Sequence, residues 1–283
     1  MTDIIDVTRP IGAAAPVVLD SPHSGTDCPA DFGYAVAPED LRLGEDPKVD
    51  ALFADAPSQG ATLVAARFPR TYIDPNRAAQ EIDPDLLDAP WPDDTPISER
   101  TRAGAGVIPR YCGPDLIPIY DRKLTVAETR NRLDGYWHPY HRALRAALDD
   151  AHGEFGGVWH LNCHSMEAVW GENWPRAGQP VEYDFILGDR DGTTSDPAFT
   201  DFLRETLEGL GYRVGVNDGP KGVELVRANG DPADNRHSVQ IEINRALYWD
   251  EEGYRPNDGW AALRENLSRF VAAICAHATE RCR

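Results

Sequence analysis

The segment Val158–Met166 constrains the fold of this chain more than any other. It is an apolar run with strand character that ends in a polar cluster containing His164. Residues 16–20 repeat the arrangement, because an apolar run there precedes His23. Open α/β sheets place functional side chains at the carboxyl ends of their strands. The sequence therefore predicts two histidines at one edge of a sheet, where they can bind a metal ion.

Further apolar segments alternate with helical patterns along the 283 residues, which are enough for one large core. Such alternation is typical of a layered α/β domain, and we expect a single domain over residues 1–283. The predicted strands are 16–20, 61–68, 158–163, 182–188, 212–216 and 237–243, and the predicted helices are about 46–57, 121–151, 195–210 and 258–280.

Residues 82–118 differ from their surroundings because they are rich in proline and acidic residues. Irregular segments of this length in compact domains are usually functional lids or are disordered. We expect a lid-like excursion within the single domain.

Charge and cysteine content limit the classes of partner and compartment. The net charge of −19, from 28 basic and 47 acidic residues, disfavours nucleic acid and anionic membranes as partners. No apolar stretch is long enough to span a bilayer, and Met1–Asp3 lacks the basic flank of a signal peptide. The five cysteines include Cys28, Cys112, Cys275 and Cys282 in separate contexts and do not suggest a disulfide framework. We expect a reduced cytoplasmic protein of unknown oligomeric state.

Three side chains are candidate metal ligands. Pro22 and Gly25 stiffen and turn the loop that presents His23, although a lone histidine of this kind can equally be structural. Asp46 precedes Pro47, so it can either cap a helix or bind a metal ion. Catalytic zinc takes three nitrogen or oxygen ligands and leaves the fourth position to water. His23, Asp46 and His164 would meet that requirement.

Two further segments offer acid–base and anion-binding groups. Glu242 lies in an alternating strand pattern, where its carboxylate either pairs with Arg245 or accepts protons in a cavity. Asn76 and Arg77 follow an Asp-Pro turn, and a guanidinium fork there can clamp a carboxylate.

Other histidines and the neighbouring cysteine have simpler interpretations. His138 and His141 lie three residues apart on a predicted helix, a spacing that can bind metal, but packing is the favoured role. Cys163 adjoins His164 in a strand, so the two side chains point to opposite faces and a Cys-His mechanism is disfavoured.

These segments, taken in order, resemble the N-formylglutamate amidohydrolase (N-formylglutamate deformylase) family over roughly residues 15–250. The order His, acid, Asn-Arg, His and Glu is also similar to that of the zinc carboxypeptidase and aspartoacylase group. The matching segments are SPHSG at 21–25, GEDPKVD at 44–50, YIDPNR at 72–77, WHPYH at 137–141, NCHSM at 162–166, NGDP at 229–232 and HSVQIEINRALY at 237–248.

The resemblance implies a three-layer α/β/α fold of the zinc exopeptidase type, with a central mixed sheet and one zinc ion per chain. Its implied ligands are His23, Asp46 and His164. Glu45 competes with Asp46 for this role, but Asp46 matches the family's acidic position better. The remaining implied roles are Glu242 as the general base, Asn76 and Arg77 as the clamp on the substrate carboxylate, and Lys221 and Arg227 as cations at the pocket rim.

The implied activity is removal of the acyl group from a small anionic N-acyl amino acid. N-formylglutamate is the leading substrate, and amino-acid catabolism, histidine degradation in particular, is the implied setting. Two alternatives stay open: an amidohydrolase for another N-acyl amino acid or a small peptide, and a non-catalytic anion-binding protein of the same fold.

Overall fold

The structure is a computed structural model that describes residues 4–93, 95, 97–171 and 174–282. Residues 1–3 and positions 94 and 96 of the predicted excursion lie outside this part. Contacts within the chain gather into two compact units. The first unit comprises residues 1–6, 22–45 and 65–144, and the second comprises 7–21, 46–64 and 145–283. A single domain over the whole chain stays a prediction.

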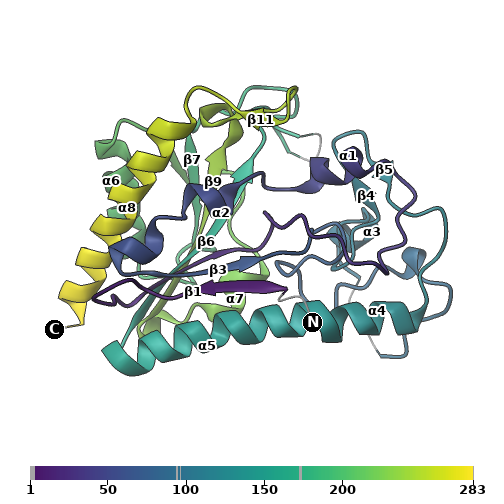
Figure 1. Ribbon diagram of the computed structural model, residues 1–283, viewed down its shortest axis with the longest axis horizontal. Helices are drawn as coiled ribbons and strands as arrows, with labels where there is room; N and C mark the ends of the chain where they lie inside the picture. Colours follow the sequence, from purple (N-terminus) through teal and green to yellow (C-terminus); the bar gives the residue numbers. More distant parts are fainter. Residues whose placement is uncertain (1–3, 94, 96, 172–173, 283) are drawn as a thin grey trace. The chain divides into compact units, whose positions relative to one another are not determined.

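Within the described residues, seven strands form one sheet in the order β1-β3-β2-β6-β9-β7-β8 (Figure 1). Strand β6 pairs in parallel with β2 and β9, whereas β7 runs antiparallel to β9. The sheet is therefore mixed, which confirms the expected α/β class. The strands are β1 (Ile5–Thr8), β2 (Val17–Ser21), β3 (Thr62–Ala66), β6 (Val158–Met166), β7 (Phe185–Gly188), β8 (Val214–Val216) and β9 (Arg236–Asn244).

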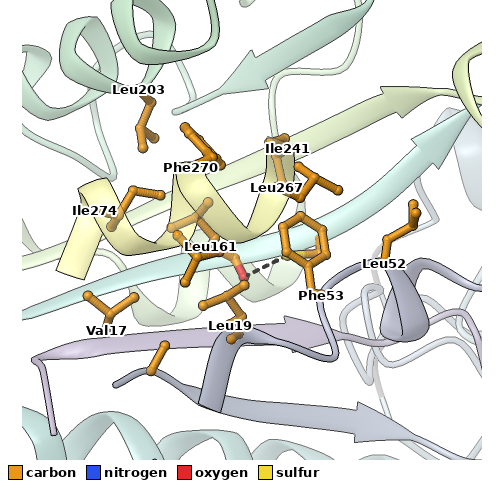
Figure 2. Close-up of a cluster of buried hydrophobic side chains, with 14 of the residues drawn as sticks. Val17, Leu19, Leu52, Phe53, Leu161, Leu203, Ile241, Leu267, Phe270 and Ile274 are labelled. Carbon is orange, nitrogen blue, oxygen red and sulfur yellow. Dashed lines mark hydrogen bonds between the residues drawn. The ribbon is translucent and has the colours of Figure 1, made fainter. Parts of the chain in front are cut away.

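The main core of the second unit lies on one face of this sheet. Helices α2 (Val49–Leu52), α6 (Pro197–Gly209) and α8 (Trp260–Arg281) supply its helical side chains. In Figure 2, Phe270 and Ile274 of α8 lie among the same buried side chains as Leu161 of β6. Burying each such side chain contributes about 1.5–3 kcal/mol.

The opposite face of the sheet carries a different layer. Helix α7 (Glu224–Asn229) contacts β6 and β9 but adds no side chain to the main core. Because side chains alternate along a strand, His160, Asn162 and His164, which alternate with the core residues Trp159, Leu161 and Cys163 of β6, belong to this second face. The second unit is thus layered helix, sheet and helix.

The long helix predicted over 121–151 is interrupted in the structure. Helix α4 (Val126–Arg132) starts with a capping box in which Thr125 and Glu128 each bond the other's backbone. A π-helical turn (Leu133–Trp137) follows, and α5 (His138–Phe155) continues from it. Pro139 explains the interruption, because it lacks a backbone N–H and its ring collides with the preceding turn of an α-helix.

The helix predicted over 46–57 is wrong in its extent. Only α2 and a 3-10 turn (Ala56–Gln59) form there. Helix α2 starts from Lys48, whose left-handed backbone (φ 58°) cannot belong to a helix that begins at Pro47. Pro57 and the left-handed Gly60 (φ 99°) then shape the end of the segment.

The described residues of the segment 82–118 are mostly irregular and lie in the first unit. Its regular pieces are a 3-10 turn (Pro84–Leu86), α3 (Glu99–Arg102) and a two-stranded ribbon of β4 (Tyr111–Cys112) and β5 (Ile117–Pro118). A lid function stays a prediction. The other short elements are α1 (Pro38–Leu41), 3-10 turns at Arg42–Gly44, Pro232–Asp234 and Arg245–Leu247, and the ribbon of β10 (Trp249–Asp250) with β11 (Arg255–Pro256).

Among the described helices, none has both the length and the apolar composition needed to cross a bilayer. All five cysteines are free thiols, and of these Cys28 is exposed.

Candidate functional site

In the second unit, His164 and Asp46 are in direct contact. His164 lies near the carboxyl end of β6, and its Nδ1 is 2.8 Å from Oδ2 of Asp46. The other carboxylate oxygen of Asp46 accepts a hydrogen bond from Arg245 at 3.4 Å. Helix α2 is capped by Lys48 without a side-chain hydrogen bond. Asp46 therefore contacts an imidazole and a guanidinium rather than capping a helix.

The neighbours of His164 determine which of its ring nitrogens carries hydrogen. Asn162 donates from Nδ2 to Asp20 Oδ1 at 2.9 Å, so its carbonyl oxygen faces His164 Nε2 at 2.7 Å. An acceptor at Nε2 requires a hydrogen there, which leaves the lone pair of Nδ1 directed at Asp46. Two electron-rich atoms this close need a cation between them. A proton can fill that place, and so can a zinc ion, whose usual ligands are histidine nitrogen and carboxylate oxygen.

A buried network on β2, β6 and β9 fixes Asp20 in turn. His160 donates from Nε2 to Asp20 Oδ1 at 2.8 Å and contacts Ser238 Oγ with Nδ1 at 2.8 Å. The set has the residue types of a nucleophilic serine triad, but all three side chains are at most 1% exposed. We interpret it as support for Asn162. This network was not predicted from the sequence, although residues 160, 162 and 164 alternate along one strand and so share a face.

Glu242 lies on β9 directly opposite His164 in the parallel register. Its Oε1 accepts a hydrogen bond from Gln240 Nε2 at 2.8 Å, and the residue is 9% exposed. The alternative partner considered for it, Arg245, is 3.4 Å from Asp46 and 3.5 Å from Glu251. Burial lowers the pKa of Arg245, but Asp46 and other nearby groups raise it above its usual value overall. Arg245 thus stays charged beside Asp46.

In the first unit, His23 is held by Asp74. Its Nε2 donates to Asp74 Oδ1 at 2.7 Å, and both side chains are at most 2% exposed. Arg70 and the backbone N–H of Asn76 donate to the same carboxylate at 2.6 and 2.8 Å. Burial raises the pKa of Asp74, but Arg70, His23 and Arg77 outweigh it and hold the pKa well below its usual range. The ionised carboxylate fixes the hydrogen on Nε2, so a metal ion, if His23 binds one, would be bound through Nδ1.

Arg77 is pinned by backbone carbonyls. Its Nε donates to Ala105 at 3.2 Å and its Nη1 to Asn76 at 3.0 Å, and Nη2 has no acceptor among the contacts described. Burial lowers the pKa of Arg77 to about 10, and the cations Arg70 and Arg100 lower it as well, against Asp74. A two-point grip on a carboxylate would therefore use the Nη1–Nη2 edge, because Nε is occupied.

The remaining predicted cations lie in surface ion pairs of the second unit. Lys221 contacts Asp191 at 2.9 Å, and Arg227 contacts Glu224 through two hydrogen bonds of 2.7 and 2.8 Å. Both cations are about half exposed. Their role at a pocket rim stays a prediction.

Glu45, the competitor of Asp46, belongs to the first unit by its contacts. It is buried, and Arg42 lies 3.7 Å from its carboxylate. Asp46, the acid preferred from the sequence, is in contact with His164, and its role as a metal ligand stays a prediction.

The simpler interpretations of the other histidines and of Cys163 agree with the structure. His138 is half exposed and lies 3.9 Å from Asp134. His141 contacts the carbonyl of Pro75 at 2.8 Å and stacks on Trp137, so it has a packing role. Cys163 is fully buried in the main core, and burial raises its pKa well above the usual value. A buried thiol of this kind cannot serve as an attacking thiolate.

His23, Asp46 and His164 are each buried and each of a residue type that can bind a metal ion. The chemistry of this set, two imidazoles and one carboxylate, fits zinc.

Comparison with known proteins assigns the chain to a family. The family model for N-formylglutamate amidohydrolase matches residues 15–249. N-formylglutamate deformylases of Pseudomonas putida and Pseudomonas aeruginosa are 28% identical over 83% of this chain and 82% of the relative, and 27% identical over 94% and 95%, respectively. The crystal structure of N-formylglutamate amidohydrolase from Ralstonia eutropha JMP134 is 47% identical, covers 98% of both chains and superposes with a TM-score of 0.91. This chain therefore belongs to the N-formylglutamate amidohydrolase family and is a hydrolase of linear amide bonds.

Proposed function

We propose that this enzyme removes the formyl group from N-formylglutamate by zinc-dependent hydrolysis. Family membership over residues 15–249 and 47% identity to an N-formylglutamate amidohydrolase support the substrate. The observation that supports zinc binding is the orientation of the His23 and His164 rings. Each has Nε2 fixed by an oxygen acceptor, at 2.7 Å in both cases, so each presents Nδ1 as a ligand.

We propose His23, Asp46 and His164 as ligands of one zinc ion per chain. The path of the main chain supports this set. Strands β2 and β6 run parallel with Asp20 opposite Asn162, and both histidines follow within three residues of this pair. Bound zinc would polarise the formyl oxygen and lower the pKa of a water molecule.

Glu242 is the proposed general base and, later, the acid that protonates the leaving amine. Its place opposite His164 in the strand register supports this role. Gln240 donates to one carboxylate oxygen and orients the group. A carboxylate near a metal site can take a proton from water and pass it on, and such transfers typically contribute about 10²–10⁴-fold in rate.

Arg77 and Asn76 are proposed to bind a carboxylate of the substrate. The local charge favours binding of an anion here. Arg70 and Arg100 lie close enough to lower the pKa of Arg77, and the nearby carboxylate of Asp74 is already paired with Arg70 and His23. An arginine fork then positions the amide for attack. Lys221 and Arg227 remain proposals for the rim.

Free thiols throughout the chain are compatible with the reducing cytoplasm as its location, and amino-acid catabolism, specifically histidine degradation, is the proposed setting.

Metal content and formate release, measured on the same preparations, test the proposal. We expect one zinc per chain and turnover of N-formylglutamate. His164→Ala should lose zinc and activity together, whereas the matched His138→Ala, an exposed histidine on α5, should keep both. Normal zinc content in His164→Ala would remove this residue from the ligand set.

A panel of N-formyl and N-acetyl amino acids decides between the substrate classes. Preference for another N-acyl amino acid would replace N-formylglutamate as the substrate. Tight binding of acidic ligands without zinc or turnover would instead indicate a binding protein.

A further inference from the structure

The loop of residues 72–77 carries Asp74, Asn76 and Arg77, and its carbonyl groups face one helical segment. Arg132 donates from Nη1 to the carbonyl of Tyr72 at 2.9 Å. Trp137 donates from Nε1 to the carbonyl of Arg77 at 2.8 Å. The third contact, His141 Nε2 to the carbonyl of Pro75, is also 2.8 Å long.

The π-helical turn makes these three contacts compatible. In an α-helix each residue rotates about 100°, so residues five apart, such as 132 and 137, point about 140° away from each other. The π turn over Leu133–Trp137 closes with a bond from the N–H of His138 to the carbonyl of Leu133, five residues earlier. This wider turn brings residues five apart onto the same side. Residues 137 and 141 then share a face through normal α-helical spacing.

Burying the charged guanidinium of Arg132 costs free energy, and the packing of the helix does not explain why an arginine is present. It is 1% exposed, and among the described contacts its guanidinium has no carboxylate partner. It lies 4.2 Å from the centre of the Tyr72 ring and donates to the carbonyl of Phe32 and to Tyr120. Burying a charge is expensive, and an apolar residue could fill the same volume. What the arginine adds is the hold on the carbonyls of Tyr72 and Phe32.

The presence of a tryptophan at position 137 is likewise better explained by its hydrogen bond than by burial. It is only partly buried and stacks on His141 with ring centres 3.6 Å apart. The stack orients both rings, so that the indole N–H and the imidazole N–H reach the ends of the Pro75–Arg77 segment.

We propose that the π turn is a positioning device for this loop, with Arg132, Trp137 and His141 as its positioning residues. It fixes the backbone at Tyr72, Pro75 and Arg77, and so aims the side chains of Asn76 and Arg77. The consequence for substrate binding rests on the proposed function, in which Arg77 holds a substrate carboxylate. The positioning of the loop does not depend on that assignment.

Trp137→Phe tests the device with little disturbance, because phenylalanine keeps a ring against His141 and removes the N–H donor. His138→Gln is the matched control, since His138 is next in the chain, half exposed and in contact with Asp134 rather than the loop. Hydrogen exchange is measured at the amides of Asp74, Asn76 and Arg77, which are all hydrogen-bonded in the structure. We expect exchange there to rise at least about threefold in Trp137→Phe and to stay unchanged in the control.

Kinetics supply the second readout. In Trp137→Phe we expect KM for N-formylglutamate to rise about 5–10-fold with kcat and zinc content near wild type. General loss of folded enzyme would instead lower kcat and leave KM unchanged. In an Arg77→Lys background, the added effect of Trp137→Phe on KM should disappear, because both changes act on one contact.

Unchanged exchange at the three loop amides would overturn the inference. So would a KM effect of Trp137→Phe that persists in full without Arg77. If exchange rises but Arg77→Lys leaves KM unchanged, the carboxylate role of Arg77 fails while the positioning of the loop is supported.

Discussion

Replacing Glu242 by glutamine should abolish most turnover while leaving the protein and its metal intact. The amide is nearly the same size, and its oxygen can still accept the hydrogen bond that Gln240 donates at 2.8 Å. It cannot take a proton from water. Loss of a general base typically lowers kcat by about 10²–10⁴-fold, which corresponds to roughly 2.7–5.4 kcal/mol of barrier.

The assay is kcat from formate release, with zinc content and the melting temperature measured on the same samples. Glu251→Gln serves as the control, because it removes a carboxylate that pairs with Arg245 at 3.5 Å but is 42% exposed. We expect the control to stay within threefold of wild type. A Glu242→Gln enzyme that also stays within threefold would refute the base assignment and leave Glu242 with a structural role.

Three further predictions concern the clamp, the support of the metal ligand and acid stability. Arg77→Lys keeps the charge but loses the planar edge, so kcat/KM for N-formylglutamate should fall at least tenfold, about 1.4 kcal/mol. The carboxamide analogue should be cleaved equally by both enzymes. If Arg77→Lys leaves kcat/KM unchanged, another residue binds the substrate carboxylate, and Arg227 is the next candidate. Asn162→Leu removes the acceptor at His164 Nε2, and competition with a chelator should show zinc affinity reduced about 10–100-fold; unchanged affinity would exclude this support. Burial, with Arg281, lowers the pKa of His277 from 6.5 to about 4, so the folded state favours the neutral ring, and stability should be lost as the pH falls from about 6.5 to 4. His277→Phe, which keeps the stack on Phe202, should remove roughly 1–3 kcal/mol of this acid loss in denaturant titrations, and identical pH profiles of the two proteins would contradict it.

Periodicity was enough to predict the sheet and its long helices. Strands β6 and β9 and helices α6 and α8 lie within a few residues of their predicted bounds, except at the end of β6. These elements owe their pattern to burial, and burial leaves an apolar period in the sequence. Strand β1 was missed because it is mostly exposed and carries no such pattern.

The prediction of one continuous helix over 121–151 was wrong at a position where the helix also contacts a segment distant in sequence. Pro139 lies inside the predicted helix, and the structure accommodates it with a π turn. The side chains of Arg132, Trp137 and His141 contact carbonyl groups of the loop of residues 72–77, which lies more than fifty residues away in sequence. Local propensity has no information on such a partner.

The candidate site, too, could be predicted from the sequence only in part. His23, Asp46, His164 and Glu242 could be named as candidates from residue type and order, because metal and proton chemistry restrict the side chains that are suitable; their roles stay predictions. The groups that hold them could not be named. In the sequence, Asp74 is recognisable only as part of a turn before Asn76 and Arg77, yet it fixes the ring of His23. Its role became visible only from the fold, because a hydrogen-bond partner is defined by distance in space.

Local and global charge act in opposite directions on an anionic substrate. The chain carries a net charge of −19, so its long-range field repels a dianion. Screening limits that field to about 8–10 Å at physiological salt, whereas Arg70 and Arg100 lie close enough to Arg77 to lower its pKa. Capture must therefore depend on contact rather than on steering. On this reasoning moderate salt leaves kcat/KM unchanged or slightly raised, and the geometry of the loop that carries Arg77 matters more than the total charge of the protein.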